Sequence, residues 1–430
     1  MHGKSNDRML PSYPSPLEEN DAQGVIGALS TSSGPRRTRP TTLPPLSLYV
    51  HFPWCIRKCP YCDFNSHAFS RTSKDIYFPE NFPEIEYINA LRADLETALP
   101  LIWGRPIHTV FIGGGTPSLL SAQAIDRLLL DLRALLLIDI NTEITLEANP
   151  ETLEATKFTS FRSSGVNRLS IGIQSFNDAH LRALGRTHDA AQCRRAVEIA
   201  RSSFDNFNLD LMFSLPNQTY AQCYTDIKTV LSFEPPHLSL YQLTLEPNTY
   251  FHKYPPALPD HDTSSDMQDW IRAHMHEAGY QCYEVSAYAK KHRYSQHNLN
   301  YWQFGDYLGI GAGAHSKLSF PERIVRQMRY KHPVRYLTQI AKGAPIHEQH
   351  EISDLDLSFE FMLNALRLTK GFPAHLFVER TGLTMKSIEP ALLEAECRGL
   401  IWRDQTNIAP TPLGQRFLND LQALFLKDKI

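Results

Sequence analysis

The sequence predicts an α/β protein in which helices alternate with the strands of a parallel sheet, and three observations lead to this. First, six short runs rich in β-branched and aromatic residues recur between residues 46 and 244. Second, amphipathic helical patterns lie between most of these runs. Third, strands that alternate with helices are typical of βαβ units, whose strands run parallel. Six such strands form either an open doubly wound sheet or an incomplete barrel, and both place ligands at the carboxyl ends of the strands.

The predicted elements follow one another along the chain. Runs such as "LSLYVHF" and "HTVFIGG" are typical of strands, and "AQAIDRLLLDLRALL" is typical of a helix. The six strands are expected at 46–52, 108–114, 143–149, 168–174, 208–214 and 237–244. The helices between them are expected at 87–99, 122–136, 190–204 and 220–233.

Changes in composition and in the regularity of the apolar pattern also divide the chain into four predicted parts. Residues 1–45 are rich in Pro, Ser, Thr and Gly and are expected to be disordered. Residues 46–245 hold the predicted strands and helices of the barrel. Residues 246–345 are less regular and are expected to extend the barrel. Residues 346–430 are mainly helical, and a hairpin predicted at 399–411 would make them a winged-helix-like module.

Composition and charge exclude several classes of protein. The 430 residues are 42% hydrophobic and 21% charged, as in ordinary globular proteins, and the formal net charge is −3. No basic field therefore indicates nucleic acid or an anionic membrane as a partner. No apolar run approaches the length of about 18 residues that a membrane span needs. The cysteines outside the motif described next are scattered, which argues against a secreted disulfide framework and indicates the reducing cytoplasm.

A cysteine motif carries the first chemical signal. In "WCIRKCPYCDFN", Cys55, Cys59 and Cys62 have the spacing C-x3-C-x2-C, and no fourth cysteine follows nearby. A structural zinc ion needs four ligands, and His51 or His67 could supply the fourth. A disulfide would leave one thiol over and is disfavoured in the cytoplasm.

A [4Fe–4S] cluster normally takes four cysteine thiolates, so three would leave one iron open for another ligand. The amino and carboxylate groups of S-adenosylmethionine (SAM) can chelate such an iron, and SAM is a carrier of radical chemistry. On this interpretation three cysteines are the required number, because a fourth would block the reactive corner. The spacing alone leaves the zinc alternative open.

A glycine-rich turn follows the second predicted strand. "GGGTPS", residues 113–118, ends that strand and precedes a helix. Glycines at such a turn allow the backbone to approach a ligand closely, and we expect its N–H groups to face a carboxylate. Alone, the turn is equally well explained as a strand-to-helix connection. Together with the cysteine motif, which follows the preceding strand, it indicates a shared site.

These motifs resemble those of the radical SAM superfamily, and of its HemN/HemW group in particular. "YVHFPWCIRKCPYCDFN", "GGGTPS", "LEANP", "GIQSF", "LGRTH" and "DLMFSLP" occur in the order typical of the group, and the likeness covers about residues 46–420. The group comprises oxygen-independent coproporphyrinogen III oxidases and their HemW relatives. The resemblance implies an incomplete (β/α)6 TIM-like radical SAM barrel, followed by a mainly helical, winged-helix-like C-terminal domain.

The resemblance also implies roles for individual residues. It gives the three cysteines as ligands of a [4Fe–4S] cluster. It implies contacts with SAM for six residues: Tyr49, Tyr61, Gly114, Gly115, Thr116 and Glu147. It places three further residues along the cofactor cavity, which in the oxidases holds a second SAM: Gln174, Arg186 and Asp210. Carboxylates can accept ribose hydroxyls and an arginine can pair a carboxylate through two bonds, but each residue could also be an ordinary polar group at a strand end.

Two features separate the branches of this group. The oxidases carry a further cysteine two residues after the triplet, and this chain has Phe64 there. The run "HNLNYW", residues 297–302, matches the H-N-x-x-Y-W signature of HemW proteins, which are regarded as haem chaperones. The imidazole of His297 would then be an axial ligand to haem. The alternative is that His297 and Asn298 cap a turn while the aromatic residues of the run pack in the core.

The resemblance therefore predicts a haem chaperone that binds a [4Fe–4S] cluster, SAM and, as its cargo, haem. Its partners would be haem and haem-acceptor proteins, with no nucleic acid and with membrane association only through an acceptor; a homodimer is one allowed oligomeric state. The alternative function is that of a radical SAM coproporphyrinogen III oxidase, which decarboxylates its substrate. A third alternative is a zinc-stabilised barrel with only a binding role. Whether the protein is an enzyme, and whether SAM is cleaved, stays open.

Overall fold

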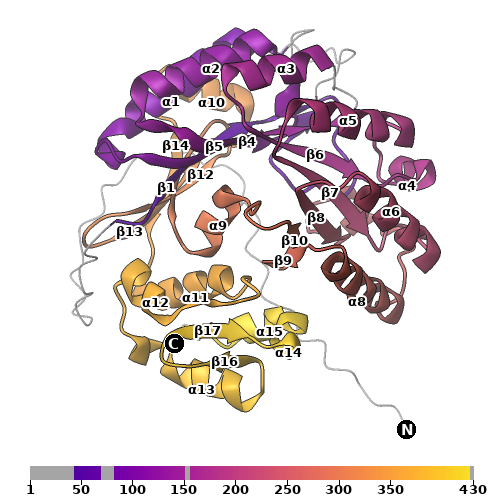
Figure 1. Ribbon diagram of the computed structural model, residues 1–430. Coiled ribbons are helices and arrows are strands. Elements are labelled where there is room, and N and C mark those ends of the chain that lie inside the picture. The colour runs from indigo at the N-terminus through magenta and orange to yellow at the C-terminus, as the bar shows by residue number, and fades with distance from the viewer. Residues whose placement is uncertain (1–42, 69–81, 151–154, 427–430) are drawn as a thin grey trace. The chain divides into compact units, whose positions relative to one another are not determined.

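The computed structural model describes residues 43–68, 82–150 and 155–426 (Figure 1). The segment predicted to be disordered, 1–45, lies outside the described residues except for its last three positions. The described residues belong to one compact unit. Within them, no helix is both long and apolar enough to cross a bilayer.

The six predicted strands are confirmed, and they lie side by side in chain order. Each pairs in parallel with the next, in the order β1-β4-β5-β6-β7-β8. A doubly wound sheet reverses its strand order near the middle, so this unbroken order corresponds to the incomplete barrel. The strands are β1 Leu46–Phe52, β4 Ile107–Gly114, β5 Ile138–Ala148, β6 Arg168–Gln174, β7 Phe207–Phe213 and β8 His237–Gln242.

The sheet continues beyond both ends of this series, and among the described residues it has twelve strands. On one side β11 pairs in parallel with β1, and β12, β13 and β14 follow antiparallel. On the other side β10 and β9 add antiparallel to β8. These strands are β9 Gln281–Cys282, β10 Ala287–Ala289, β11 Asp306–Ile310, β12 His315–Ser319, β13 Ile324–Arg329 and β14 Ile346–Glu351. A separate parallel pair consists of β2 Trp54–Cys55 and β3 His67–Ala68.

The region 246–345 is therefore more regular than the sequence predicts. Strands β9 and β10 of this region have two and three residues, and β14, which begins just after the region, is exposed along most of its length. Strands this short or this exposed carry no alternation of apolar and polar residues, so the pattern in the sequence does not reveal them. The helices of the region are α7 Tyr250–Lys253, α8 His261–Glu277, α9 Gln296–Trp302 and α10 Pro333–Ile340.

The helices that connect the parallel strands lie on the outside of the curved sheet (Figure 1). Side chains that accept backbone N–H groups define where several of them begin. Ser121 accepts the N–H of Ala124 at the start of α2, and Thr219 and Gln222 form a capping box at α6. The helices are α1 Glu84–Ile102, α2 Ala122–Leu135, α3 Ala155–Ser164, α4 Asp178–Ala183, α5 Ala190–Ser203 and α6 Tyr220–Ser232, with a 3-10 turn at Pro117–Leu119. The patterns in the sequence do not predict α3 and α4.

Alternate residues of the parallel strands face opposite sides of the sheet. The side chains that face the outer helices are fully buried in one apolar core: Leu48, Ile112, Leu146, Ile171 and Leu209. Burial of each contributes about 1.5–3 kcal/mol to folding. The residues between them face the interior of the barrel, and this inner face is largely polar.

The C-terminal part has a second apolar core. The hairpin predicted at 399–411 is confirmed as β16 Ile401–Arg403 and β17 Asn407–Pro410, and β15 Phe372–Pro373 completes a three-stranded sheet. After the hairpin the chain forms two short helices that divide at Phe417. The helices are α11 Asp354–Ala365, α12 Ala374–Thr381, α13 Glu389–Cys397, α14 Pro412–Arg416 and α15 Leu418–Ala423, with a 3-10 turn at Met385–Ser387. The limits of the predicted domains stay predictions.

Candidate functional site

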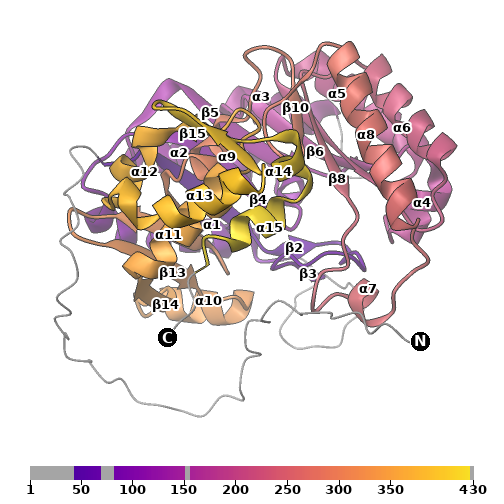
Figure 2. The same cartoon turned by 90° about the horizontal axis from the view of Figure 1, so that it is seen from below.

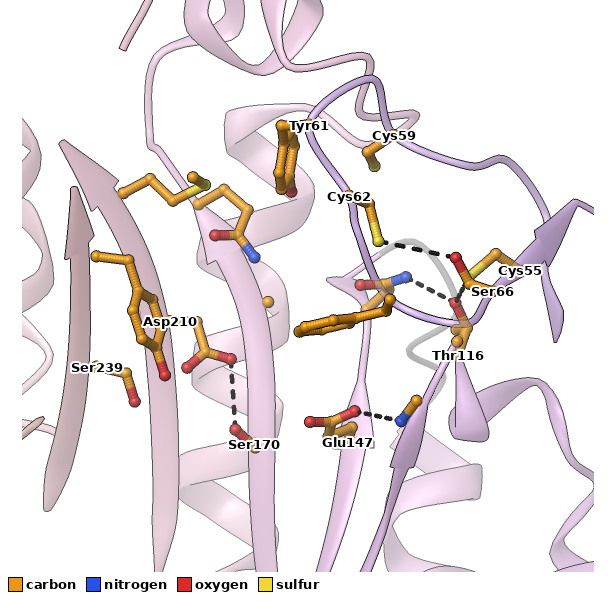
Figure 3. Close-up of a pocket in the computed structure, with 18 of the residues that line it drawn as sticks. Cys55, Cys59, Tyr61, Cys62, Ser66, Thr116, Glu147, Ser170, Asp210 and Ser239 are labelled. Atoms are coloured by element: carbon orange, nitrogen blue, oxygen red, sulfur yellow. Dashed lines mark hydrogen bonds between the residues drawn. The ribbon is translucent and has the colours of Figure 1, made fainter. Parts of the chain in front are cut away.

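A cavity of about 490 Å³ lies among the carboxyl-terminal halves of the parallel strands. Its walls are the inner faces of β4 to β8, the turns after them, and the segment after β1 that carries the three cysteines. Figure 3 shows the cysteines at one end of the cavity and Glu147, Ser170 and Asp210 deeper among the strands. Eleven of the thirteen predicted site residues line it: Cys55, Cys59, Tyr61, Cys62, Gly114, Gly115, Thr116, Glu147, Gln174, Arg186 and Asp210.

Backbone hydrogen bonds hold the segment that carries the cysteines. It leaves β1 through β2, which pairs with β3. Between these strands the N–H of Cys62 donates to the Cys59 carbonyl at 3.1 Å. The Pro60 carbonyl accepts the N–H of Phe251 at 3.0 Å, which places α7 beside this segment (Figure 2). The three sulfurs are therefore presented by a loop that is attached to the barrel at several points.

Each cysteine sulfur has a polar hydrogen beside it. Such donors stabilise thiolates and tune the potential of an iron–sulfur cluster. The pairs are Thr116 Oγ1 to Cys55 Sγ at 3.4 Å, Arg186 Nη1 to Cys59 Sγ at 3.6 Å, and the Ser66 hydroxyl beside Cys62 Sγ at 3.7 Å.

Two of the three thiols differ from an ordinary cysteine in their acidity. Burial raises the pKa of the Cys55 thiol to about 11 and also raises that of Cys62, so a metal centre that takes them as thiolates displaces protons. Among the described residues, no three His, Cys, Asp or Glu side chains are grouped so that they could hold one metal ion. In a [4Fe–4S] cluster each cysteine sulfur binds its own iron, so the three sulfurs need not converge on one ion.

The two histidines considered as a fourth zinc ligand differ in their surroundings. Both ring nitrogens of His51 are engaged, Nδ1 with the Tyr49 hydroxyl at 3.0 Å and Nε2 with the Asn65 carbonyl at 2.9 Å. Burial lowers the pKa of His51 to about 4, so the ring is neutral. His67 lies on β3, and its Nε2 is buried with no hydrogen-bond partner among the described residues. His51 therefore braces the cysteine segment and has no nitrogen left for a metal.

The glycine-rich turn forms part of the cavity wall, and three of its backbone N–H groups already donate to other parts of the protein. The acceptors are Glu147 Oε2 for Gly114 at 2.9 Å, the Phe52 carbonyl for Gly115 at 2.6 Å and the Trp54 carbonyl for Thr116 at 2.8 Å. The prediction that these N–H groups face a carboxylate is confirmed for Gly114, whose acceptor is the protein's own Glu147, and is wrong for Gly115 and Thr116, which donate to backbone carbonyls. Gly114 has a φ of +115°, and a Cβ there would lie 2.6 Å from the His51 ring.

Two carboxyl groups point into the cavity, Glu147 from β5 and Asp210 from β7 (Figure 3). Burial raises the pKa of Glu147 to about 8; the N–H of Gly114 opposes this shift, and the like charge of Asp210 adds to it. Burial also raises the pKa of Asp210, against hydrogen bonds from Asn208 at 2.7 Å and Ser170 at 3.4 Å. A positively charged ligand would favour the ionised form of both groups, so this part of the cavity suits a cation.

Two predicted site residues, Tyr49 and His297, do not line the cavity. Tyr49 is directed at His51 instead. His297 lies on α9 and stacks on Phe111, a residue of the cavity wall, with ring centroids 5.0 Å apart. Its Nδ1 bonds to Thr109 Oγ1 at 2.7 Å, and its Nε2 is buried with no hydrogen-bond partner in the described part of the chain.

The run "HNLNYW" forms α9, and Ser295 is its N-cap. The alternative in which His297 and Asn298 cap a turn is therefore wrong, since both lie in the first turn of a helix. The aromatic part of that alternative is confirmed for Trp302, which is half-buried against the second core, with the Arg367 guanidinium 4.2 Å from its ring. Asn298, unlike its neighbour, lines the cavity.

Comparison with known proteins matches this arrangement. A profile of the radical SAM superfamily matches residues 49–230, and a profile of the HemN C-terminal domain matches residues 352–417. The chain is 46% identical over 393 residues to heme chaperone HemW of Haemophilus influenzae, which covers 90% of this chain and 99% of that protein. It is 44% identical over 388 residues to heme chaperone HemW of Escherichia coli, again over 90% and 99% of the two chains. The chain belongs to the HemW family of radical SAM proteins.

A solved structure shares the fold of this HemW family member. Coproporphyrinogen III oxidase (HemN) from Escherichia coli matches with a TM-score of 0.75 at 23% identity, over 90% of this chain and 91% of that one. The match confirms the partial barrel with its C-terminal domain. Membership of the radical SAM superfamily implies a [4Fe–4S] cluster and SAM. The three sulfurs with their donors and the two carboxyl groups deeper in the cavity fit both cofactors.

Several residues of the cavity wall are missing from the sequence-based prediction. They are Asn149, Arg168, Ser170, Asn208, Ser239 and Tyr241. A signal for some of them exists, because residues 168, 170, 172 and 174 alternate along one predicted strand and share its inner face. The sequence does not say which of the two faces of that strand is the inner one.

Glu147→Gln should make the free energy of unfolding less dependent on pH. The pKa of Glu147 is about 8 in the folded chain, whereas the ordinary value for a glutamate, which applies to the unfolded chain, is 4.5. Between these two pH values the folded chain therefore keeps a proton that the unfolded chain has lost. The wild-type chain therefore loses stability as the pH rises from about 4.5 to about 8, and the glutamine variant, which cannot ionise, does not lose this contribution. We expect the stability of the variant relative to wild type to rise over this range in urea unfolding of the metal-free chain. Glu198→Gln, at an exposed residue of α5, is the control; parallel curves for wild type and Glu147→Gln would contradict the raised pKa.

Proposed function

We propose that this chain is a haem chaperone of the HemW type, which carries a [4Fe–4S] cluster, binds SAM and passes haem to acceptor proteins. The observation that carries the proposal is Phe64, which stands where the oxidases have a further cysteine and is 59% exposed at the mouth of the cavity. Relatives named heme chaperone HemW align with this chain over nearly their whole length, which supports the same choice.

Different residues of the cavity would bind the cluster and SAM. Cys55, Cys59 and Cys62 would hold the cluster, which when bound supplies an electron and one iron open to the amino and carboxylate groups of SAM. Glu147 would accept hydrogen bonds from the polar groups of SAM, and its carboxylate would favour the positive sulfonium. Arg186 keeps its place through Nη2, which donates to the Gly172 carbonyl at 3.0 Å, while Nη1 lies 3.6 Å from Cys59 Sγ.

Further predicted residues would complete the SAM site. Tyr61 would cover the adenine, Gly114, Gly115 and Thr116 would shape the wall beside the methionine part, and Gln174 and Asp210 would offer polar contacts farther along the cavity. Tyr49 would act indirectly: its hydroxyl would orient the His51 ring, against which Gly114 packs.

His297 would be the axial ligand to haem iron. Burial lowers its pKa to about 3, so its imidazole is neutral, as metal ligation requires. The Thr109 hydroxyl donates to Ser47, so the Nδ1 of His297 donates to Thr109 and Nε2 keeps its lone pair. Ligation requires that α9 and Phe111 move apart, because Nε2 is buried. The proposed setting is the cytoplasm, with acceptor proteins as partners and with any membrane contact made through them.

His297→Ala should weaken the Soret band that develops when the reconstituted chain is titrated with haemin. Loss of an axial nitrogen removes one bond to the iron, and we expect the apparent affinity to fall about tenfold or more, which corresponds to about 1.4 kcal/mol. His261→Ala, at an exposed histidine of α8, is the matched control. Equal Soret titrations for His297→Ala and wild type would place the ligand elsewhere.

One preparation should then be assayed both for coproporphyrinogen turnover and for haem transfer to apo-acceptor proteins. The proposal predicts transfer without turnover. Turnover by the wild-type chain, in the absence of transfer, would favour the oxidase alternative and contradict the chaperone.

A further inference from the structure

Arg168 is a buried cation that lines the floor of the cavity. It is the first residue of β6, its side chain enters the interior from the amino end of that strand, and it is 2% exposed. Gln174, at the other end of β6, lines the same cavity. Six steps along a strand span about 20 Å. The cavity therefore runs along the strand, with the cysteines at one end and Arg168 at the other.

The guanidinium of Arg168 is near enough to Asp210 to lower the pKa of that carboxyl, but it has no hydrogen-bond partner in the described part of the chain. No hydrogen bond or ion pair joins it to another described residue, and its Nε is buried and unpaired. The two carboxylates in this part of the interior are engaged by other groups. Asp210 accepts hydrogen bonds from Asn208 and Ser170, and Glu143 accepts two N–H groups of α9.

The other buried cations in the described part of the chain have carboxylate partners. Among the described residues, three Lys or Arg side chains are buried: Arg168, Lys317 and Arg329. Lys317 pairs with Asp306 at 2.9 Å, and Arg329 pairs with Asp94 at 3.2 Å. Neither of these two lines the cavity. A guanidinium does not lose its proton in proteins, and burying it unpaired is costly, so an unpaired one that faces a cavity indicates an anionic ligand.

We propose that Arg168 is the anchor for a carboxylate of the ligand that fills the cavity. The planar guanidinium matches a carboxylate through two parallel hydrogen bonds. A carboxylate carries one negative charge, which the single positive charge of Arg168 balances, whereas a doubly charged phosphate would leave one negative charge in excess, so a singly charged group fits better. Thr145, the neighbour of Arg168 across the sheet, has a buried hydroxyl with no hydrogen-bond partner among the described residues, and this hydroxyl can donate to the same carboxylate.

Two ligands of the proposed function carry carboxylates. A SAM molecule that chelates iron uses its carboxylate at the cysteine end, about 20 Å from Arg168 along β6. A propionate of haem is therefore the source that we expect, and this choice rests on the proposed function. The proposal that Arg168 anchors a carboxylate does not rest on the binding of haem, because SAM also carries a carboxylate.

The test compares ligands with and without the carboxylate on the reconstituted full chain. In the first arm, haemin and its dimethyl ester are titrated by their Soret bands. In the second arm, SAM and decarboxylated SAM are compared by equilibrium dialysis. Wild type should bind haemin about tenfold or more tightly than the ester, as expected for a buried charge-assisted bond. Arg168→Gln should lose this preference, and Arg168→Lys should restore part of it. Arg195→Gln removes the same charge from an exposed position on α5 and should behave as wild type.

The outcomes separate the anchor from the haem proposal. A haemin preference that Arg168→Gln abolishes supports a propionate at the floor. If Arg168→Gln reduces the preference for SAM but not that for haemin, Arg168 binds the carboxylate of SAM. A chain that binds no haem would count against the proposed function only. Because the SAM carboxylate also chelates iron, the SAM arm is read only from the change that Arg168→Gln makes. A wild-type chain that binds haemin and its ester equally, or a haemin preference that persists in Arg168→Gln, overturns the anchor when Arg168→Gln also leaves the preference for SAM unchanged. The wild-type comparison of haemin with its ester needs no variant, so equal binding there counts against a propionate at Arg168 even where a variant fails to fold.

Discussion

The anaerobically reconstituted Cys59→Ser chain should lack the broad visible absorption of an iron–sulfur cluster. The three sulfurs lie on one loop at one end of the cavity, and Cys59 is the one that Arg186 contacts. A serine hydroxyl is a harder and weaker ligand for cluster iron than a thiolate, so the cluster should lose one of its three attachments to the chain. Iron and acid-labile sulfide should fall together with the absorption, and both can be measured on the same sample.

Cys397→Ser is the matched control for this experiment. Cys397 is exposed at the end of α13, so the same chemical change there should leave iron, sulfide and absorption as in wild type. A normal spectrum for Cys59→Ser would contradict the cluster ligands proposed here. Zinc in place of iron in the wild-type chain, without sulfide, would support the zinc-stabilised barrel instead.

Asp94→Ala should lower the free energy of unfolding by about 3–5 kcal/mol, the usual cost of removing one partner from a buried ion pair. Asp94 is fully buried on α1, and it accepts from the Arg329 guanidinium at 3.2 Å, the Tyr336 hydroxyl at 2.9 Å and the Gly311 N–H at 3.0 Å. Its loss leaves a buried guanidinium without a carboxylate. Urea unfolding of the variant should show a large fall in the midpoint.

Two comparisons separate the ion pair from a general effect of substitution. Asp126→Ala removes an exposed carboxylate from α2 and should change the free energy of unfolding by no more than about 0.5 kcal/mol. The double variant Asp94→Ala with Arg329→Met removes both charges and should be more stable than Asp94→Ala alone. A double variant that is less stable than the single one would mean that Arg329 is not the group that Asp94 neutralises.

Local patterns were sufficient for the core of the fold. The predicted limits of β1 and β6 are confirmed to the residue, because these strands are apolar runs buried on the outer face and bounded by turns. The three cysteines, the glycine turn and the acidic residue of "LEANP" meet in one cavity because each follows or ends a parallel strand. Parallel strands bring their carboxyl ends to one edge of the sheet, so these motifs could be placed together from their order alone.

Other features left no local pattern. Strand β14 is exposed, and the strands at the other edge are very short, so the extension of the sheet on both sides of the barrel went unpredicted. The sequence predicts that the N–H groups of the glycine turn face a ligand, yet the carbonyls of Phe52 and Trp54 and the carboxylate of Glu147 accept three of them. Those acceptors come from two other segments of the chain, whose positions relative to the turn depend on how the strands align.

The sequence by itself determined which segments become the parallel strands, which loop carries three thiols and which branch of its family the chain resembles, since each of these depends on residues that are near neighbours along the chain. Only the tertiary structure decided which buried charges have partners. Arg329 meets Asp94 across 235 positions, whereas Arg168 meets no carboxylate among the described residues and faces the cavity instead. Pairing across such distances depends on strand register and helix packing, and both arise from the sum of many weak contacts, so no short run of residues specifies them.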